Sequence, residues 1–460
     1  MENIRKEHIL ADDNIGRLHW KLAVPAMVGM FVMAMYNIVD TIFVGRAVGT
    51  NAIAALTVAF PMQMIVMGFG IMNGIGSAAL ISISIGEGNR EKANRIFHNS
   101  LLMVLFLGLL FTIVLQIFLD DVIVLFGASV EVLPFTRQYL RIIMLGATFQ
   151  IAAMTGNNII RSEGQAKIAM ISMISGAVLN IILDAVFILI FKMGVQGVAI
   201  GTVIAQLTQT VYQYIYFKSR KSSLIYKFCL KEFNIGIVRD IFRIGVPSFL
   251  RNIAGSLMMI IFNNVLRKYG GAIALASAGV IFKFLNFTFM PVIGIAQGMQ
   301  PIVGFNFGAQ RPDKVVQAWK LAALRASTIS VLSFIFVMLF PRLIISIFTT
   351  DEELLKLASH AIRIMFTGSI VIGFQITGAT FFQAVNKPLP ALVLSISRQM
   401  LFLIPLLLIL PGFMGLNGAW VAHPISDILS AFITAAFLWK EIIRMKTRAI
   451  EKAEPLINQS

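Results

Sequence analysis

The sequence predicts an all-α polytopic membrane protein of twelve transmembrane helices, arranged as two pseudo-symmetric lobes of six helices each. Hydrophobic residues make up 58% of the 460 residues and charged residues only 13%, with a mean hydropathy of +0.84. Soluble domains do not reach these values. Apolar runs of 18 or more residues, each able to cross a bilayer, recur along the chain. The two halves of the chain also repeat each other's motifs.

The individual helices follow from apolar runs set against their polar breaks. The twelve predicted helices cover residues 18–44, 53–84, 95–118, 134–160, 167–191, 195–217, 241–267, 272–306, 315–341, 357–384, 388–410 and 415–440.

An internal repeat relates the two halves. The repeated pairs are Pro25 and Pro247, Arg141 and Arg363, each 222 residues apart, and Gly194 and Gly415, 221 apart after one deletion. Six spans per half is an even number, so both lobes should have the same topology. Two such parallel lobes are typical of transporters.

Charge in the breaks predicts the domains and the orientation. We expect an N-terminal lobe at residues 1–217, a cytoplasmic linker at 218–240, a C-terminal lobe at 241–445 and a cytoplasmic tail at 446–460. Lysine and arginine are concentrated in alternate breaks, in the linker and at both ends. By the positive-inside rule both termini are cytoplasmic, in a multi-pass protein of the plasma membrane.

Composition also excludes several classes of function. The net charge of +16 is explained by the short basic loops, so we expect no nucleic-acid partner. The single cysteine, Cys229, allows no intrachain disulfide and no thiolate metal cluster. The sequence has no phosphate-binding Gly-Lys-Ser/Thr loop and no HExxH motif, so we expect no cofactor and no direct use of ATP.

Polar residues of the first lobe fall at similar depths. Counting ~1.5 Å per residue from the outer helix ends places Asp40 ~9 Å, Asp184 ~12 Å and Asn180 ~18 Å below the surface. The same count places Thr202 ~10 Å and Gln206 ~16 Å deep. An aspartate in hydrocarbon costs at least ~2.5–3.5 kcal/mol, so intramembrane carboxylates usually face a polar cavity or an ion path.

This set has two chemical interpretations and a structural alternative. Two carboxylates, an amide and a hydroxyl suit a hard cation, and desolvation would also favour proton loading. Sodium and proton are therefore both open as ligands, and the residues are metal ligands only if the ion is Na⁺. Alternatively, Asn180 and Asp184 bind helix 5 to its neighbours, and Asp40 lies close to the headgroups.

The second lobe is built differently. Its spans contain Lys283 in helix 8, Arg398 in helix 11, and His423 with Asp427 in helix 12. Arg398 and Asp427 fall near the midplane, where they can form an internal ion pair that fixes helix 11 on helix 12. We expect His423 to hydrogen-bond within this pair. A proton relay through His423 and Asp427 is the alternative.

The sequence resembles the multidrug and toxic compound extrusion transporters over essentially residues 15–445. The motifs that carry the resemblance are Pro-Ala-Met at Pro25, Tyr36–Asp40, Gly156–Gly164, Leu179–Asp184 and Gly197–Thr202. The resemblance implies a V-shaped transporter with two lobes that exports cationic or amphipathic drugs in exchange for sodium or protons.

Within that family the chain is similar to the branch related to the DNA-damage-inducible transporters. The resemblance implies a first-lobe cation site with a surrounding polar network that contacts substrate. The cation-site residues are Asp40, Asn180, Asp184 and Thr202, and the network residues are Tyr36, Asn37, Tyr139, Asn157 and Gln206. The acid that a sister branch carries in helix 7 is missing, and Arg251, Asn252 and Asn263 are the polar residues there.

The expected function is therefore secondary active efflux by alternating access, with a small organic cation or amphipathic drug as substrate, membrane lipid as surroundings and a monomer as the working unit. One alternative is a flippase for lipid-linked oligosaccharide, which should line its cleft with several arginines for pyrophosphate. Another is a membrane-embedded enzyme, but no nucleophile and base or metal constellation is found in the sequence.

Overall fold

The computed structural model describes residues 9–47, 50–125, 131–219, 221–226 and 232–457, and within these it describes no side chains for residues 37–54, 125, 446 and 448–457. This part of the chain is almost entirely helical, with short turns between the helices and no strand.

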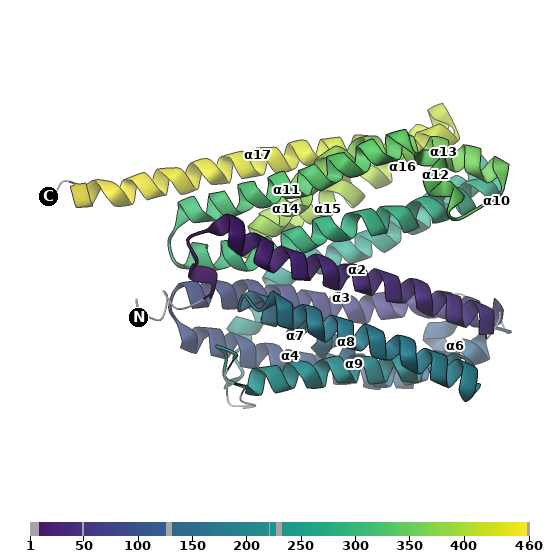
Figure 1. Ribbon diagram of the computed structural model, residues 1–460, viewed down its shortest axis with the longest axis horizontal. Helices are drawn as coiled ribbons and strands as arrows, with labels where there is room; N and C mark the ends of the chain where they lie inside the picture. Colours follow the sequence, from purple (N-terminus) through teal and green to yellow (C-terminus); the bar gives the residue numbers. More distant parts are fainter. Residues whose placement is uncertain (1–8, 48–49, 126–130, 220, 227–231, 458–460) are drawn as a thin grey trace. The chain divides into compact units, whose positions relative to one another are not determined.

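The first half contains the helices drawn from purple to teal in Figure 1. They are η1 (Ile9–Ala11), α2 (Ile15–Ala47), α3 (Thr50–Gly86), α4 (Arg90–Ile117), α5 (Leu119–Leu125), α6 (Leu133–Leu145), α7 (Ala147–Ser162), α8 (Ala166–Ala185), the π-helix η2 (Val186–Ile190) and α9 (Gly194–Lys218). α6 and α7 are bent by 52° at Gly146 and together make one span.

The second half repeats this order. Its helices are α10 (Ile235–Gly308), α11 (Pro312–Leu339), α12 (Pro341–Ser346), α13 (Glu352–Phe366), the 3₁₀ turn η4 (Thr367–Val371), α14 (Ile372–Ala384), α15 (Pro388–Ile396), the π-helix η5 (Ser397–Leu403), α16 (Ile404–Met414) and α17 (Leu416–Ile457). α10 is two helices that meet at Gly271, whose φ of 62° no helix allows.

The twelve-helix layout follows from these elements. Among the described residues, nine helices are long and apolar enough to span a membrane, or ten with the bent pair α6 and α7. The two arms of α10 are separate spans, and α9, which carries four glutamines, completes the twelve. The predicted end of the last helix near residue 440 is wrong, since α17 continues to Ile457. Its Lys, Glu, Arg and Ala residues are strong helix formers that need no apolar surroundings.

The internal repeat is visible in the backbone. Outside α10, the positive φ angles fall largely at repeated positions: Gly88 and Gln310, Gly164 and Asn386, and Gly194 and Gly415. Each pair stands at the polar break between two spans, where a left-handed residue ends one helix and lets the next begin. The repeat therefore preserves the turn geometry even where glycine is replaced by glutamine or asparagine.

The chain forms two compact units. The boundaries between them fall inside α2 and inside the first arm of α10, at positions that are equivalent in the repeat. One unit is built on Val28–Phe249, and the other on Leu250–Ser460 together with the start of α2 up to Met27. Thus α2 and the first arm of α10 each pass from one unit to the other. The expected lobes, which end at residue 217 and begin at residue 241, follow the two halves of the sequence. They do not anticipate that the start of α2 belongs to the second unit and the start of α10 to the first.

Glycines explain how the exchanged segments pack so closely. In the first unit, a Cβ built on Gly76 of α3 would lie 2.1 Å from the carbonyl oxygen of Ile241, and one on Gly245 would lie 2.1 Å from that of Met72. In the second unit, a Cβ on Gly298 would lie 2.7 Å from the backbone of Ala23. Small residues at such contacts let helix backbones meet, as is usual in membranes.

The linker after α9 makes hydrogen bonds with the rest of the first unit at two places. Glu163, buried between α7 and α8, accepts hydrogen bonds from the Tyr216 hydroxyl at 2.9 Å, the Ser222 hydroxyl at 3.0 Å and the Ser223 backbone N–H at 2.6 Å. Burial raises the pKa of the Glu163 carboxyl, and these donors offset part of that effect.

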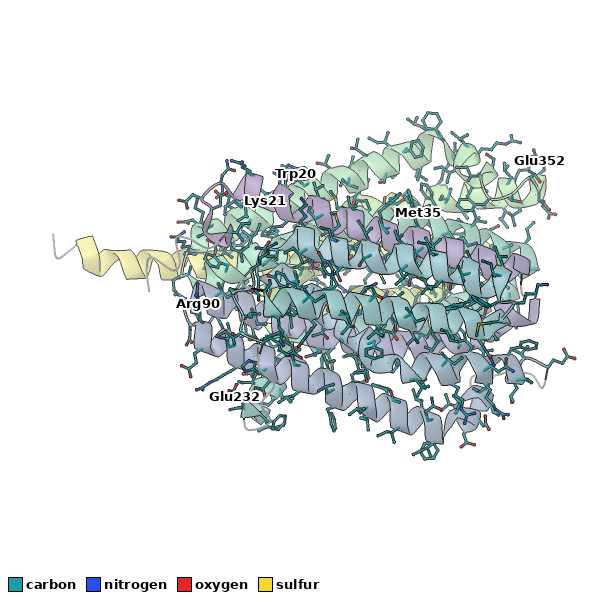
Figure 2. All side chains as sticks on the ribbon, turned by 60° about the horizontal axis from the view of Figure 1, so that its bottom comes forward. Trp20, Lys21, Met35, Arg90, Glu232 and Glu352 are labelled. Carbon is teal, nitrogen blue, oxygen red and sulfur yellow. The ribbon has the colours of Figure 1, made fainter. Side chains whose placement is uncertain are left out.

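The second contact joins the linker to α4. Glu232 pairs with the His98 ring, and its backbone carbonyl accepts from the Asn99 side chain at 3.1 Å. The Asn99 side chain also accepts from the Asn234 backbone N–H at 2.8 Å. Figure 2 shows Glu232 beside the end of the bundle where α4 begins at Arg90. The connection between the two halves is therefore held against the first unit.

Replacing Gly76 by alanine should lower thermal stability, because the added methyl group would force α3 away from Ile241. Overpacking of this kind costs about 1–3 kcal/mol. Thermal unfolding of the purified protein in detergent measures it. Gly412→Ala is the control, since a Cβ there meets nothing within 4 Å. Equal melting temperatures for the two variants would contradict the close approach.

Replacing Glu163 by glutamine should remove a pH dependence of stability. Because burial raises the folded-state pKa of Glu163 above its ordinary value of 4.5, the folded state binds the proton more tightly than the unfolded state. The carboxyl therefore contributes stability at low pH that is lost as pH rises through the folded-state pKa.

Melting temperatures of wild type and Glu163→Gln, compared from about pH 5 to about pH 8, test this expectation. The wild type should lose stability relative to the variant as pH rises. A constant difference, or one that changes in the opposite sense, would contradict it.

Candidate functional site

Three of the expected cation-site residues meet between α8 and α9. Asn180 and Asp184 lie one turn apart on α8 and are buried, with exposures of 3% and 0%. The Asn180 amide nitrogen donates to the Thr202 hydroxyl of α9 at 3.5 Å. A Cβ built on Gly201 would lie 2.8 Å from Asp184 Oδ1, so the α9 backbone passes directly over this carboxyl group.

The site contains buried oxygen atoms whose hydrogen bonding is incomplete. Within the described part of the chain, Asn180 Oδ1 and Gln206 Oε1 accept no hydrogen bond. Leaving a buried polar atom unsatisfied costs about 1–3 kcal/mol. Amide, hydroxyl and carboxylate oxygens are the donors that hard cations take. Asn180, Asp184 and Thr202 therefore fit Na⁺ chemically, and the carboxyl group can instead take a proton.

Two expected residues of the first span cannot be compared in the same way. Asp40 and Asn37 both belong to α2, but their side chains lie outside the described residues. Tyr36, one turn before Asp40, is described and partly buried. No three His, Cys, Asp or Glu side chains among those described are grouped to hold a metal.

The other expected network residues bridge helices. The Tyr139 hydroxyl accepts from the Gln63 side chain of α3 at 2.8 Å. Asn157 donates to the Ala169 carbonyl at 2.9 Å and so joins α7 to α8. Asn157 is therefore engaged in helix packing.

Sequence reasoning missed two glutamines. Gln63 is the partner of Tyr139, and Gln213 of α9 donates to the Ala153 carbonyl at 3.0 Å and to the Ser172 hydroxyl at 3.1 Å. Gln213 therefore links three helices. Both are amides within apolar runs, a signal that would have identified them as polar groups needing a partner.

In the second unit, Arg398 of η5 donates to Asp427 of α17 at 3.2 Å. His423 differs from the expectation, because it makes no hydrogen bond to Asp427. Its ring packs edge-on against Phe262 and Phe282, with centroids 5.0 and 6.0 Å away, and its Nε2 atom finds no partner among the described residues. The imidazole therefore packs against aromatic rings, while Asp427 pairs with Arg398.

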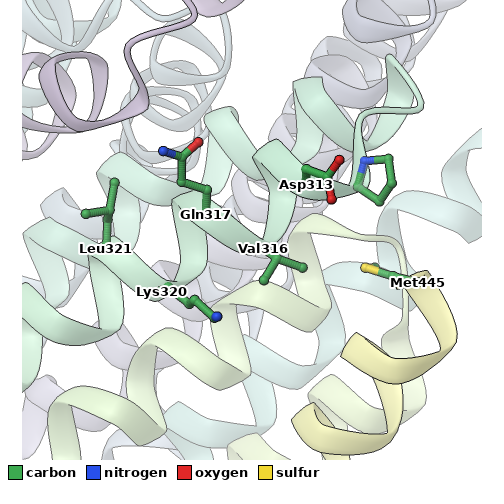
Figure 3. A pocket seen from close by; sticks show the side chains of 7 residues that line it. Asp313, Val316, Gln317, Lys320, Leu321 and Met445 are labelled. Carbon is green, nitrogen blue, oxygen red and sulfur yellow. The ribbon is translucent and has the colours of Figure 1, made fainter. Parts of the chain in front are cut away.

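A pocket of about 440 Å³ lies at the start of α11 against α17, shown in Figure 3. Its lining residues are Pro312, Asp313, Val316, Gln317, Lys320, Leu321 and Met445. None of the expected site residues borders this pocket, so it is separate from the polar clusters of the spans.

Comparisons with known proteins agree with this architecture. A multidrug export protein, MepA, from Staphylococcus aureus is 29% identical over 429 residues, 93% of this chain and 93% of the relative. MepA from Staphylococcus haemolyticus is 27% identical over 90% of this chain and 91% of its own. A solved outward-facing multidrug resistance MATE family transporter of the MOP superfamily superposes with a TM-score of 0.90 at 26% identity, over 95% of this chain and 98% of that chain.

The family model MatE matches the chain twice, at residues 25–186 and 247–409. The two matches begin 222 residues apart, which is the spacing of the internal repeat. Together they cover most of the sequence, and the matched segments contain Asn180 and Asp184 of the first unit and Arg398 of the second. The chain therefore belongs to the MatE family, the multidrug and toxic compound extrusion transporters, and is a membrane transporter and not an enzyme.

Proposed function

We propose that this chain is a multidrug efflux transporter of the plasma membrane that exchanges cationic or amphipathic organic compounds for Na⁺ or H⁺. The observation that carries the proposal is the buried contact of Asn180 with Thr202, with Asp184 one turn away under Gly201. A carboxyl group so far from solvent is stable only if it is protonated or paired with a cation. Its occupancy can therefore respond to an ion gradient.

Coupling requires that the ion and the conformation of the first unit depend on each other. Asp184 is well placed for this, because its carboxyl group lies against the α9 backbone at Gly201. Loading a proton or Na⁺ changes the charge at a helix contact that has no room to spare. We infer that Asp40 of α2 contributes the second carboxyl group, on the basis of its depth and spacing from Tyr36.

The DNA-damage-inducible branch is the proposed subgroup. A first-unit site supports this assignment, and so does the absence of an acid from residues 241–267 in the first arm of α10, where Arg251, Asn252 and Asn263 are polar residues. We also propose that both termini are cytoplasmic, supported by the lysine and arginine residues that gather near both ends and in the linker. We propose that the protein works as a monomer and that both of its compact units take part in transport.

The lipid-linked oligosaccharide flippase is a weaker second candidate. It would need several cations to hold a pyrophosphate group. The spans of the second unit do contain Arg251 and Arg398, but Asp427 already offsets one of these two charges. These two arginines therefore offer less positive charge than a pyrophosphate group needs.

Asp184→Asn and Asp40→Asn should each abolish ion-driven efflux, because an amide of the same shape takes up neither a proton nor the charge of a cation. The measurement is ethidium efflux from proteoliposomes, with a sodium gradient and a pH gradient imposed separately. The wild type should follow one of the two gradients, and that gradient identifies the coupling ion.

Asp121→Asn is the matched control, since Asp121 is an exposed acid of α5, and its efflux should equal that of wild type. Ion-driven efflux that persists in both Asp184→Asn and Asp40→Asn, with the proteins folded and inserted, would refute first-unit coupling.

A further inference from the structure

The pocket between the start of α11 and α17 combines an apolar wall with polar groups. Its volume is about 440 Å³, within the range of pockets that hold small ligands. Val316 and Met445 are apolar, whereas Asp313, Gln317 and Lys320 border the same cavity with polar side chains. Figure 3 shows the polar residues following one another along α11, with Met445 on the helix across from them. We call this cavity the α11–α17 pocket.

The exposed face of α11 shows how deep the pocket lies in the membrane. Along this face the exposed side chains are polar up to Lys320, and from Leu324 onward they are mainly apolar. Leu324 is 66% exposed and Leu332 is 60% exposed, as expected where a helix meets lipid tails. Lys320 lies one turn before Leu324, ~6 Å along the helix axis. The lipid-facing surface of α11 therefore ends where the pocket begins.

α17 gives the same depth independently. Residues 428–438 contain no charged side chain, and Trp439, which follows them, is 74% exposed. Lys440 and Arg444 come next, and tryptophan followed by basic residues marks the edge of a bilayer. Met445 lies six residues beyond Trp439, ~9 Å along the axis, where each headgroup layer is ~5–8 Å thick. Both helices thus place the pocket at the level of the lipid headgroups.

The polar groups of the pocket are open to a ligand. The side chains of Asp313, Gln317 and Lys320 make no hydrogen bond or ion pair with any described residue, and all three are exposed. Lys314 differs, since it pairs with Asp13 at 3.4 Å. One carboxylate and one ammonium group therefore remain available in the same cavity, which suits a ligand that carries both charges.

The order of these two charges along α11 matches one class of headgroup. Lys320 lies toward the hydrocarbon, and Asp313 lies seven residues nearer the water, ~10 Å along the axis. A lysine near hydrocarbon extends its ammonium group toward water, which brings the two charges closer than their backbones. A phospholipid likewise presents its phosphate near the acyl chains and its terminal group farther out.

The terminal group decides which phospholipid fits. A primary ammonium matches the Asp313 carboxylate in charge and can donate hydrogen bonds to it. A neutral glycerol would leave the carboxylate without an opposite charge, and a quaternary ammonium has no N–H to donate. The carboxylate therefore favours the primary ammonium over both.

We propose that the α11–α17 pocket binds a phospholipid whose headgroup ends in a primary ammonium, of which phosphatidylethanolamine is the simplest. Lys320 holds the phosphate and Asp313 the ammonium, while Gln317 lies between them and hydrogen-bonds the oxygens of the headgroup. The bound lipid joins α11 to α17. The pocket contains none of the residues assigned to ion coupling, so this inference does not depend on the proposed efflux function.

Competition between lipids tests the proposal. The purified protein in detergent is mixed with equal amounts of phosphatidylethanolamine, phosphatidylglycerol and phosphatidylcholine, and native mass spectrometry separates the complexes by mass. The wild type should retain phosphatidylethanolamine about twofold to fivefold better than either of the other two lipids, the range expected for an ion pair between exposed groups.

Four variants locate the binding site. Asp313→Asn should remove the preference for phosphatidylethanolamine, and Lys320→Gln should weaken all three lipids because each has a phosphate. Leu321→Trp should also weaken all three, since it fills the pocket and keeps both charges. Lys356→Gln removes an exposed lysine of α13 and, as the matched control, should bind like wild type.

Equal retention of the three lipids by the wild type would show an adventitious additive only and would overturn the proposal. A preference for phosphatidylethanolamine that survives Asp313→Asn would also overturn it, because the ammonium would then bind elsewhere. Neither result bears on ion-driven efflux, which is tested at Asp40 and Asp184. Loss of efflux in those variants would in turn leave lipid binding unchanged.

Discussion

The rest of the structure depends on one constraint, that hydrocarbon offers no hydrogen-bonding partner to a polar group. The spans meet it by bonding their polar side chains to neighbouring helices. Asn73 of α3 reaches the Ser100 carbonyl and the Thr155 hydroxyl, and Asn157 reaches Ala169. Against this background, the buried Oδ1 atom of Asn180 is one of several polar atoms that find no partner among the described residues. It lies in the cluster to which we assign ion binding.

Much of the fold could be predicted because the bilayer fixes the length of an apolar run. Each of the twelve predicted helices corresponds to a helix, to one arm of α10 or to a run of two or three consecutive helical segments, with most ends displaced by a few residues. The bend at Gly146 and the π-helices η2 and η5 could not be predicted, since they arise from packing between spans. The exchange of the two helix starts was also hidden, because Gly76 and Gly298 reveal a close approach only when their neighbours are known.

The candidate site was predictable to the extent that depth depends on helical rise. The count of ~1.5 Å per residue placed Asn180 ~18 Å and Thr202 ~10 Å deep, both in the outer half of the same lobe, and in the structure their side chains are in contact. It gave no information on rotation about the helix axis. Asn157 was expected in the network from the family resemblance alone, and its side chain bridges α7 and α8. His423 was expected to hydrogen-bond with the Arg398–Asp427 pair, and its ring packs against Phe262 and Phe282. The partners Gln63 and Gln213 were missed for the same reason.

The exchange of helix starts bears on how a protein of this kind can arise by duplication. Each compact unit includes the start of a helix that belongs to the other half of the sequence. These helix starts end at residues 27 and 249, which are equivalent in the repeat. A chain of one half alone would lack the helix start that completes its unit. Its own helix start would be available to complete the unit of another molecule. Two copies could then complete each other as a domain-swapped pair. Joining the two copies through a linker would keep the swap within one chain. Each unit would then always have one exchanged helix start available.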